Sequence, residues 1–183
     1  MLRKMAFVVA GLVAAGSVAF ADTGTKNNLQ VFHDVSSRIN HYALFTVFDS
    51  VEIGAKDGVV TLHGQVTMPY KRDDLGRLAA KVDGVREVRN EITVLPASIS
   101  DDRLRYRVAR SIFSNPSLQR YALGANPSIH IVVDRGHVTL TGVVNSALDQ
   151  RLAVLAANQF PAFSVTNDLK TEAEVRNALE HLD

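Results

Sequence analysis

The sequence contains no cysteine among its 183 residues. This absence excludes structural disulfides, thiol catalysis and metal sites built on cysteine. It also excludes a lipid-modified N-terminal cysteine, so we predict that the mature protein is not a lipoprotein.

An excess of charge of one sign is also absent. The chain has 20 basic and 19 acidic residues, a formal net charge of +1. This balance gives no global attraction to nucleic acid, and we predict no nucleic-acid partner. The charge is unevenly placed, because residues 101–172 carry two more basic than acidic residues while residues 34–96 carry one fewer.

Motifs of phosphate sites and hydrolases are absent too. There is neither GxGxxG nor GxxxxGK, and no serine lies in a GxSxG context. The acidic pairs Asp73-Asp74 and Asp101-Asp102 stand at expected helix starts, where carboxylates serve as caps. We therefore predict that the protein is not an enzyme, that it has no catalytic residues and that it takes no cofactor.

The six histidines do not form a metal-binding pattern. No HxxxH or HxH pair occurs, and His63, His130 and His137 are far apart in the sequence. A zinc site needs three or four ligands brought together, so we predict no metal site.

The N-terminus has the features of a secretory signal peptide over residues 1–21. Arg3 and Lys4 precede an apolar stretch, which ends in Ala19-Phe20-Ala21. The alternative is a membrane anchor, but the apolar stretch is short for a span of about 20 residues. We expect cleavage after Ala21 and export to a bacterial periplasm.

A short phrase occurs twice at a fixed offset. Residues 56–66 read KDGVVTLHGQV, and residues 134–144 read DRGHVTLTGVV. Such self-similarity indicates a duplicated unit. Asp57-Gly58 and Arg135-Gly136 each separate two alternating apolar stretches, which predicts two hairpins.

Each unit shows the same order of expected elements, helix, strand, strand, helix, strand. In unit one Asp34 is the expected N-cap of the first helix, and Gly84 is expected to end the second helix. The sequence therefore predicts an α+β fold, a tandem αββαβ module with three-stranded mixed sheets, each packed against two helices. The expected ranges are a flexible leader 22–33, unit one 34–96, a linker 97–100, unit two 101–172 and a short C-terminal helix 173–183.

The repeated pattern resembles the BON domain, a family named for bacterial OsmY and nodulation proteins. The pattern is a G-x-V-x-L-x-G phrase followed by a helix and an Asn-containing strand. Unit one carries it in Gly58, Val60, Leu62, Gly64, Gly84 and Asn90, and unit two in Gly136, Val138, Leu140, Gly142 and Asn167. Turn chemistry and close strand–helix packing explain these glycines better than phosphate binding.

The resemblance implies a non-catalytic module of the bacterial envelope. Members of the family are proposed to bind phospholipid surfaces, and some act in osmotic or envelope stress or as chaperone-like factors. Unit two departs from the pattern where unit one has Asp83-Gly84-Val85, because it has Phe160-Pro161-Ala162-Phe163 there.

Two groups in unit two are candidate sites. Arg103, Arg107 and Arg110 recur at helical spacing and can bind lipid phosphate, although such a row is more often a solvated face. Phe160 and Phe163 can anchor in a membrane interface, but we favour a core position for both.

These observations predict adhesion to anionic phospholipid or to an envelope protein, in support of envelope integrity or the response to osmotic stress. The alternative is a protein-interaction or chaperone-like module that does not depend on lipid. The oligomeric state stays open.

Overall fold

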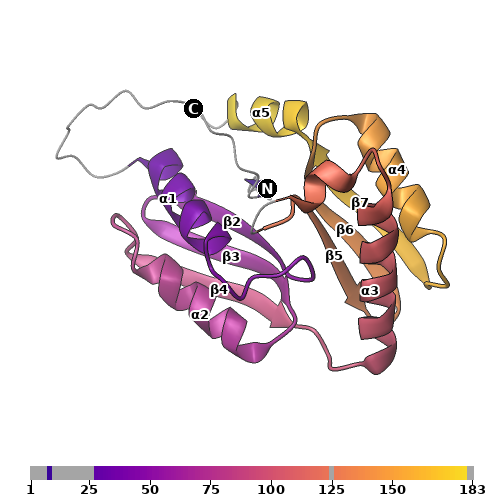
Figure 1. Cartoon of the computed structure of the whole chain (residues 1–183). Coiled ribbons are helices and arrows are strands. Elements are labelled where there is room, and N and C mark those ends of the chain that lie inside the picture. The colour runs from indigo at the N-terminus through magenta and orange to yellow at the C-terminus, as the bar shows by residue number, and fades with distance from the viewer. Residues whose placement is uncertain (1–7, 10–26, 124–125, 181–183) are drawn as a thin grey trace, which may run out of the picture.

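The computed structural model describes residues 8–9, 27–123 and 126–180. The chain forms two units of the same element order, followed by a C-terminal helix (Figure 1). Unit one comprises α1 (Asn28–Asn40), β2 (Ser50–Lys56), β3 (Val59–Val66), α2 (Pro69–Ala80) and β4 (Glu87–Val94). Unit two comprises α3 (Ile99–Ser114), the short 3-10 helix η1 (Gln119–Ala122), β5 (Ile129–Asp134), β6 (His137–Val144), α4 (Ala147–Ala157) and β7 (Ser164–Thr171), and is followed by α5 (Glu172–Glu180).

The two sheets have the same topology. In each unit the first two strands form an antiparallel hairpin, and the third strand pairs in parallel with the second. Both helices of a unit cover one face of its sheet (Figure 1). The predicted α+β class and the duplicated αββαβ module are confirmed.

Each unit has its own hydrophobic core, built from the alternating residues of the repeated phrase. Val60 and Leu62 in unit one, and Val138 and Leu140 in unit two, are completely buried. The helices contribute residues at helical spacing, such as Val108 in α3. Burial of each such side chain stabilises the fold by about 1.5–3 kcal/mol.

The glycines of the phrase have two different backbone roles. Asp57-Gly58 has φ values of 50° and 74°, and Arg135-Gly136 has 49° and 80°. Such two-residue turns with positive φ match the twist of a hairpin. Gly64 and Gly142 lie within the second strand at φ 135° and 116°, where a Cβ would overlap a backbone carbonyl, that of Ser50 at the start of β2 and that of Ser128 directly before β5. The close approach is thus between two strands, and not between strand and helix as we expected.

Several element boundaries differ from the predictions. Helix α1 begins at Asn28, with Asn27 and not Asp34 as its N-cap, because Val31 extends the buried row of the helix by one turn. Residues 28–33 therefore belong to a helix and not to a flexible leader. Helix α2 ends at Ala80, so Gly84 does not end it but lies in the following loop at φ 91°.

The predicted signal peptide, 1–21, and the first residues of the leader lie outside the described residues, apart from the two-residue strand β1 (Val8–Val9). This strand pairs antiparallel with β2 at Ile53 and Glu52.

The motif asparagines link strand to helix or to their own strand. The Asn90 amide donates to the Arg72 carbonyl of α2 at 2.8 Å. Asn90 and Asn167 each accept a hydrogen bond at 3.3 Å from the backbone amide two residues further on.

A buried ion pair joins the start of α2 to the segment before β2. Lys71 Nζ lies 2.6 Å from the Asp49 carboxylate, and both side chains are buried. Thr46 and Thr67 donate to the same carboxylate from backbone and hydroxyl groups. Burial alone would raise the pKa of Asp49, but the hydrogen bonds from Lys71, Thr46 and Thr67 outweigh it and lower the pKa.

Unit two has a different polar link at the same place. Asp149, at the start of α4, accepts hydrogen bonds from Tyr121 Oη at 2.9 Å, from Arg120 at 2.8 Å and from Ser146 Oγ at 2.7 Å. In each unit, therefore, a polar side chain ties the second helix to the connection that precedes the hairpin.

The two units contact each other beside β5. The Ile131 amide donates to the Val47 carbonyl at 2.7 Å, the Ser50 and Thr141 hydroxyls lie 2.8 Å apart, and the Phe45 ring centroid lies 5.5 Å from that of His130. Burial at this contact lowers the pKa of His130, so its ring is neutral at pH 7.

We expect Gly64→Ala to destabilise the protein by about 3 kcal/mol, because the new Cβ meets the Ser50 carbonyl in a left-handed backbone conformation. Urea unfolding measures the loss. Gly54→Ala in β2 is the control, since Gly54 does not have a positive φ, and it should cost less than about 1 kcal/mol. Equal losses for the two variants would contradict the assigned role.

We expect Asp49→Asn to lower the free energy of unfolding at pH 7 by about 3–5 kcal/mol, because it leaves Lys71 buried without its partner. The folded pKa of Asp49 is depressed, so its contribution is fully present above about pH 4 and is lost as the pH falls further. Urea unfolding across pH 3–7 measures this. Asp73→Asn, at a half-exposed carboxylate, is the control and should leave the pH profile unchanged.

Candidate functional site

Helix α3 presents a row of arginines to solvent. The helix begins where Ser98 Oγ accepts from the Asp101 amide at 3.2 Å, and Leu104, Val108 and Ile112 hold its inner face in the core. Helical spacing places Arg103, Arg107 and Arg110 together on the exposed side. Within the described ranges, no carboxylate lies within ion-pair distance of these three arginines. We call them the arginine row.

The fourth arginine of α3 has a different place. Arg105 is only 4% exposed. Its guanidinium donates to the Val133 carbonyl of β5 at 2.6 Å and pairs with Asp102. Arg105 therefore fastens α3 to the sheet and is not available to a ligand.

Arg107 lies over an aromatic ring of the neighbouring connection. Its guanidinium carbon is 4.7 Å from the centroid of Phe160, which follows α4. Phe160 is partly buried and packs against the core of unit two, as we favoured. The contact orients Arg107 beside α4, since cations are attracted to the face of an aromatic ring.

Phe163 is 82% exposed, so the preference for a core position is wrong for this residue. Its amide donates to the Gly136 carbonyl at 2.9 Å, as the Arg86 amide does to Gly58 at 2.7 Å in unit one. Phe163 thus takes the place of Arg86, because each residue directly precedes the third strand of its unit. Its ring lies against the turn glycine, with the His137 ring 5.6 Å away.

Asp101 holds the β5–β6 turn against the start of α3. Its carboxylate accepts from the Arg135 and Gly136 amides, each at 2.9 Å. It was predicted to cap α3, but Ser98 is the N-cap. The contact brings the exposed side chains of Arg135 and Phe163 to the end of unit two where α3 begins. Arg135 was not among the predicted site residues, although its place in the Arg-Gly turn could have indicated it.

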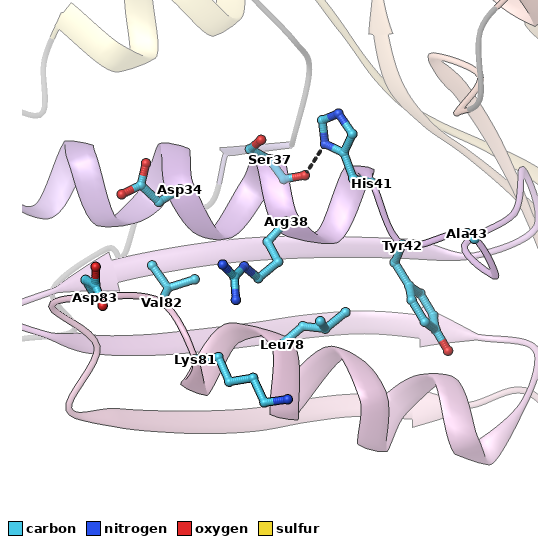
Figure 2. A pocket seen from close by; sticks show the side chains of 10 residues that line it. All are labelled: Asp34, Ser37, Arg38, His41, Tyr42, Ala43, Leu78, Lys81, Val82 and Asp83. Carbon is cyan, nitrogen blue, oxygen red and sulfur yellow. Dashed lines mark hydrogen bonds between the residues drawn. The ribbon is translucent and has the colours of Figure 1, made fainter.

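Unit one has a groove of about 620 Å³ between α1 and α2 (Figure 2). Its charged residues are of both signs, and His41 bonds the Ser37 carbonyl at 2.6 Å and not its hydroxyl, so these two form no nucleophile–base pair. Burial and a hydrogen bond to Asp74 raise the pKa of Tyr42 at one end of the groove. The ionisable side chains that line it are Asp34, Arg38, His41, Tyr42, Lys81 and Asp83.

The histidines that the structure describes do not converge. His63 on β3 is exposed and lies 3.8 Å from Glu91, His130 is buried between the units, and His137 is at the hairpin turn of unit two. In the part of the chain that the structure describes, no three histidine or acidic residues are placed to hold a metal ion. Among the same residues, no helix has the length and apolar character needed to cross a membrane.

We expect Phe160→Ala to lower the free energy of unfolding by about 2 kcal/mol, because it removes a partly buried ring from the core. Phe163→Ala should change it by less than about 0.5 kcal/mol, since that ring faces solvent. Urea unfolding of both variants checks the difference. A larger loss for Phe163→Ala would place its ring in the core after all.

A comparison with protein families agrees with the duplicated architecture. A family model described as BON domain matches residues 35–96 and 100–179. No curated protein matches the chain. Two similar solved structures are CdsD, a structural protein of the type III secretion system of Chlamydia trachomatis (13% identity, TM-score 0.28, 82% of this chain and 97% of that chain), and the C-terminal domain of the same protein (13%, 0.29, 79% and 98%). With a family match over most of its length, the chain belongs to the BON domain family and carries two tandem copies of the domain.

Proposed function

We propose that this protein is a non-catalytic periplasmic protein that adheres to anionic phospholipid surfaces through unit two and so supports the envelope under osmotic stress. The arginine row carries this proposal, because Arg103, Arg107 and Arg110 are exposed on one side of α3. Membership of the BON domain family, whose members are proposed to bind phospholipid surfaces, supports it. The predicted signal peptide supports the periplasmic location.

The expected adhesion is weak and sensitive to salt. Each basic residue near an anionic bilayer contributes about 1 kcal/mol, and this contribution falls off within a Debye length. Three arginines together provide about 3 kcal/mol at low ionic strength. Arginine also suits lipid phosphate because its planar group donates several hydrogen bonds at once.

Unit one does not offer the same surface. The corresponding helix α1 has a single arginine, Arg38, and its side chain lies in the mixed-charge groove (Figure 2). Helix α2 has several basic residues, but Arg72 and Arg77 pair with the neighbouring Asp73 and Asp74. The two copies of the domain are therefore proposed to differ in function.

One observation favours a second candidate, a chaperone-like module that binds apolar segments of other proteins. The Phe163 ring is exposed at the end of unit two. Such a module would suppress aggregation of a client protein with no dependence on lipid charge.

We expect the triple substitution of Arg103, Arg107 and Arg110 by glutamine to weaken co-sedimentation with phosphatidylglycerol vesicles about a hundredfold at low salt. Binding to phosphatidylcholine vesicles should be weak before and after the change. The matched control replaces Arg72, Arg77 and Arg89 of unit one by glutamine, which removes the same charge from exposed side chains.

The control variant should retain most of its binding. Sedimentation of the α3 variant at the level of the unchanged protein would refute the proposed site. The chaperone-like alternative would be favoured if the unsubstituted protein does not bind vesicles and both it and the α3 variant suppress aggregation of a client protein.

A further inference from the structure

Helix α4 is apolar on two opposite sides. Its inner side is lined by small residues, and Ala153, Ala156 and Ala157 are buried against the sheet. Its outer side carries Leu148 and Leu155, each 63% exposed. A helix on the surface of a globular protein normally has one apolar stripe, so the outer leucines are not explained by the fold.

The equivalent helix of unit one serves as an internal comparison. Helix α2 lies 78 residues earlier and has Tyr70 and Arg77 where α4 has Leu148 and Leu155. Asp74 and Arg77 form an ion pair on that surface. The same module thus folds with a tyrosine and an arginine on this side, and the exposed leucines of α4 are particular to unit two. We call Leu148 and Leu155 the leucine row.

The leucine row lies beside the arginine row. Helices α3 and α4 pack next to each other on one face of the sheet (Figure 1). Ser111 Oγ of α3 bonds Gln159 at 3.4 Å, and Arg107 lies over Phe160, so this side of α3 faces the connection that follows α4. At about 100° per residue, Arg107 and Ser111 lie on the same side of α3, so the arginine row borders the end of α4 that carries Leu155.

Side-chain contacts join α3 to the connection after α4 on the side where unit one has its groove. In unit one the side chains between α1 and α2 leave about 620 Å³ open. In unit two, the Phe160 ring and the Ser111–Gln159 contact lie on the corresponding side. Exposed leucines beside arginines suit a partner with a broad apolar surface and negative charge at its boundary. They suit less well a partner helix, which would bind in a groove between α3 and α4.

Charge favours a bilayer over a second copy of the chain as the partner of the leucine row. Arg107 and Arg110 border the leucine row, and Arg151 is exposed on α4 itself. The one carboxylate of α4, Asp149, is buried and bound to Arg120. Two copies that met through α4 would place these arginines near one another, whereas anionic headgroups are complementary to them.

We propose that α4 inserts the leucine row into the headgroup–acyl boundary of an anionic phospholipid bilayer, while the arginine row of α3 binds the phosphates above it. This inference rests on the proposed function and adds the element that enters the apolar region. An apolar side flanked by basic residues is the arrangement by which helices lie in a membrane interface.

The absence of tryptophan from the chain provides a direct test. A single tryptophan is introduced as Leu148→Trp in the leucine row or, as the matched control, as Tyr70→Trp at the equivalent position of α2. With phosphatidylglycerol vesicles, Leu148→Trp fluorescence should shift to the blue and be quenched by lipids brominated on their acyl chains. Tyr70→Trp fluorescence should do neither.

The outcomes separate this inference from the proposed function. Vesicle co-sedimentation of Leu148→Trp without a blue shift or quenching would overturn insertion and leave adhesion intact. If the unsubstituted protein does not co-sediment with vesicles, both the insertion and the proposed function are overturned. Equal quenching of Leu148→Trp and Tyr70→Trp would also overturn the proposal that α4 is the helix that inserts.

A second variant tests the leucine row without a reporter. The double substitution Leu148→Gln and Leu155→Gln should weaken vesicle binding about tenfold or more while the melting temperature stays unchanged, because both side chains are exposed. Unchanged vesicle binding would contradict insertion. A second result would also contradict insertion. If the unsubstituted protein sediments as a dimer, and the double substitution dissociates this dimer without changing vesicle binding, the leucine row is a contact between two copies of the chain.

Discussion

The structure depends on the close approach of two strands at one glycine in each unit. Gly64 and Gly142 lie where any Cβ would overlap the carbonyl of Ser50, at the start of β2, or of Ser128, directly before β5. This pairing sets the register of the hairpin, and the register decides that Val60, Leu62 and their counterparts face the core. The third strand pairs with the same central strand, and the helices cover the face that results. The side-by-side position of α3 and α4, on which the proposed function depends, follows from this geometry.

Within this shared scaffold, the two copies have diverged wherever the backbone does not constrain them. Unit one ties its second helix with the buried Lys71–Asp49 pair, and unit two uses Asp149 with Tyr121 and Arg120. The outer side of the second helix has become apolar in unit two alone. This apolar side and the arginine row of α3 are the physical basis for proposing lipid adhesion by one copy only.

The sequence predicts those features of the structure that depend on residues close together in the chain. The hairpin turns follow from Asp57-Gly58 and Arg135-Gly136, and the exposed arginine row follows from helical spacing. Other features depend on residues distant in the chain. Arg105 is buried because the Val133 carbonyl lies opposite it, and Phe163 is exposed because it directly precedes β7 beside the hairpin turn, as Arg86 precedes β4. The leucine row looks like core in the sequence, since only the packed helix shows that alanines fill its inner side.

Hydrogen exchange of the full chain with and without phosphatidylglycerol vesicles tests the central claim most directly. The account predicts slower amide exchange in α3, α4 and the β5–β6 turn, and unchanged exchange in α1 and α2. Protection confined to the groove between α1 and α2, or no protection anywhere, would contradict it.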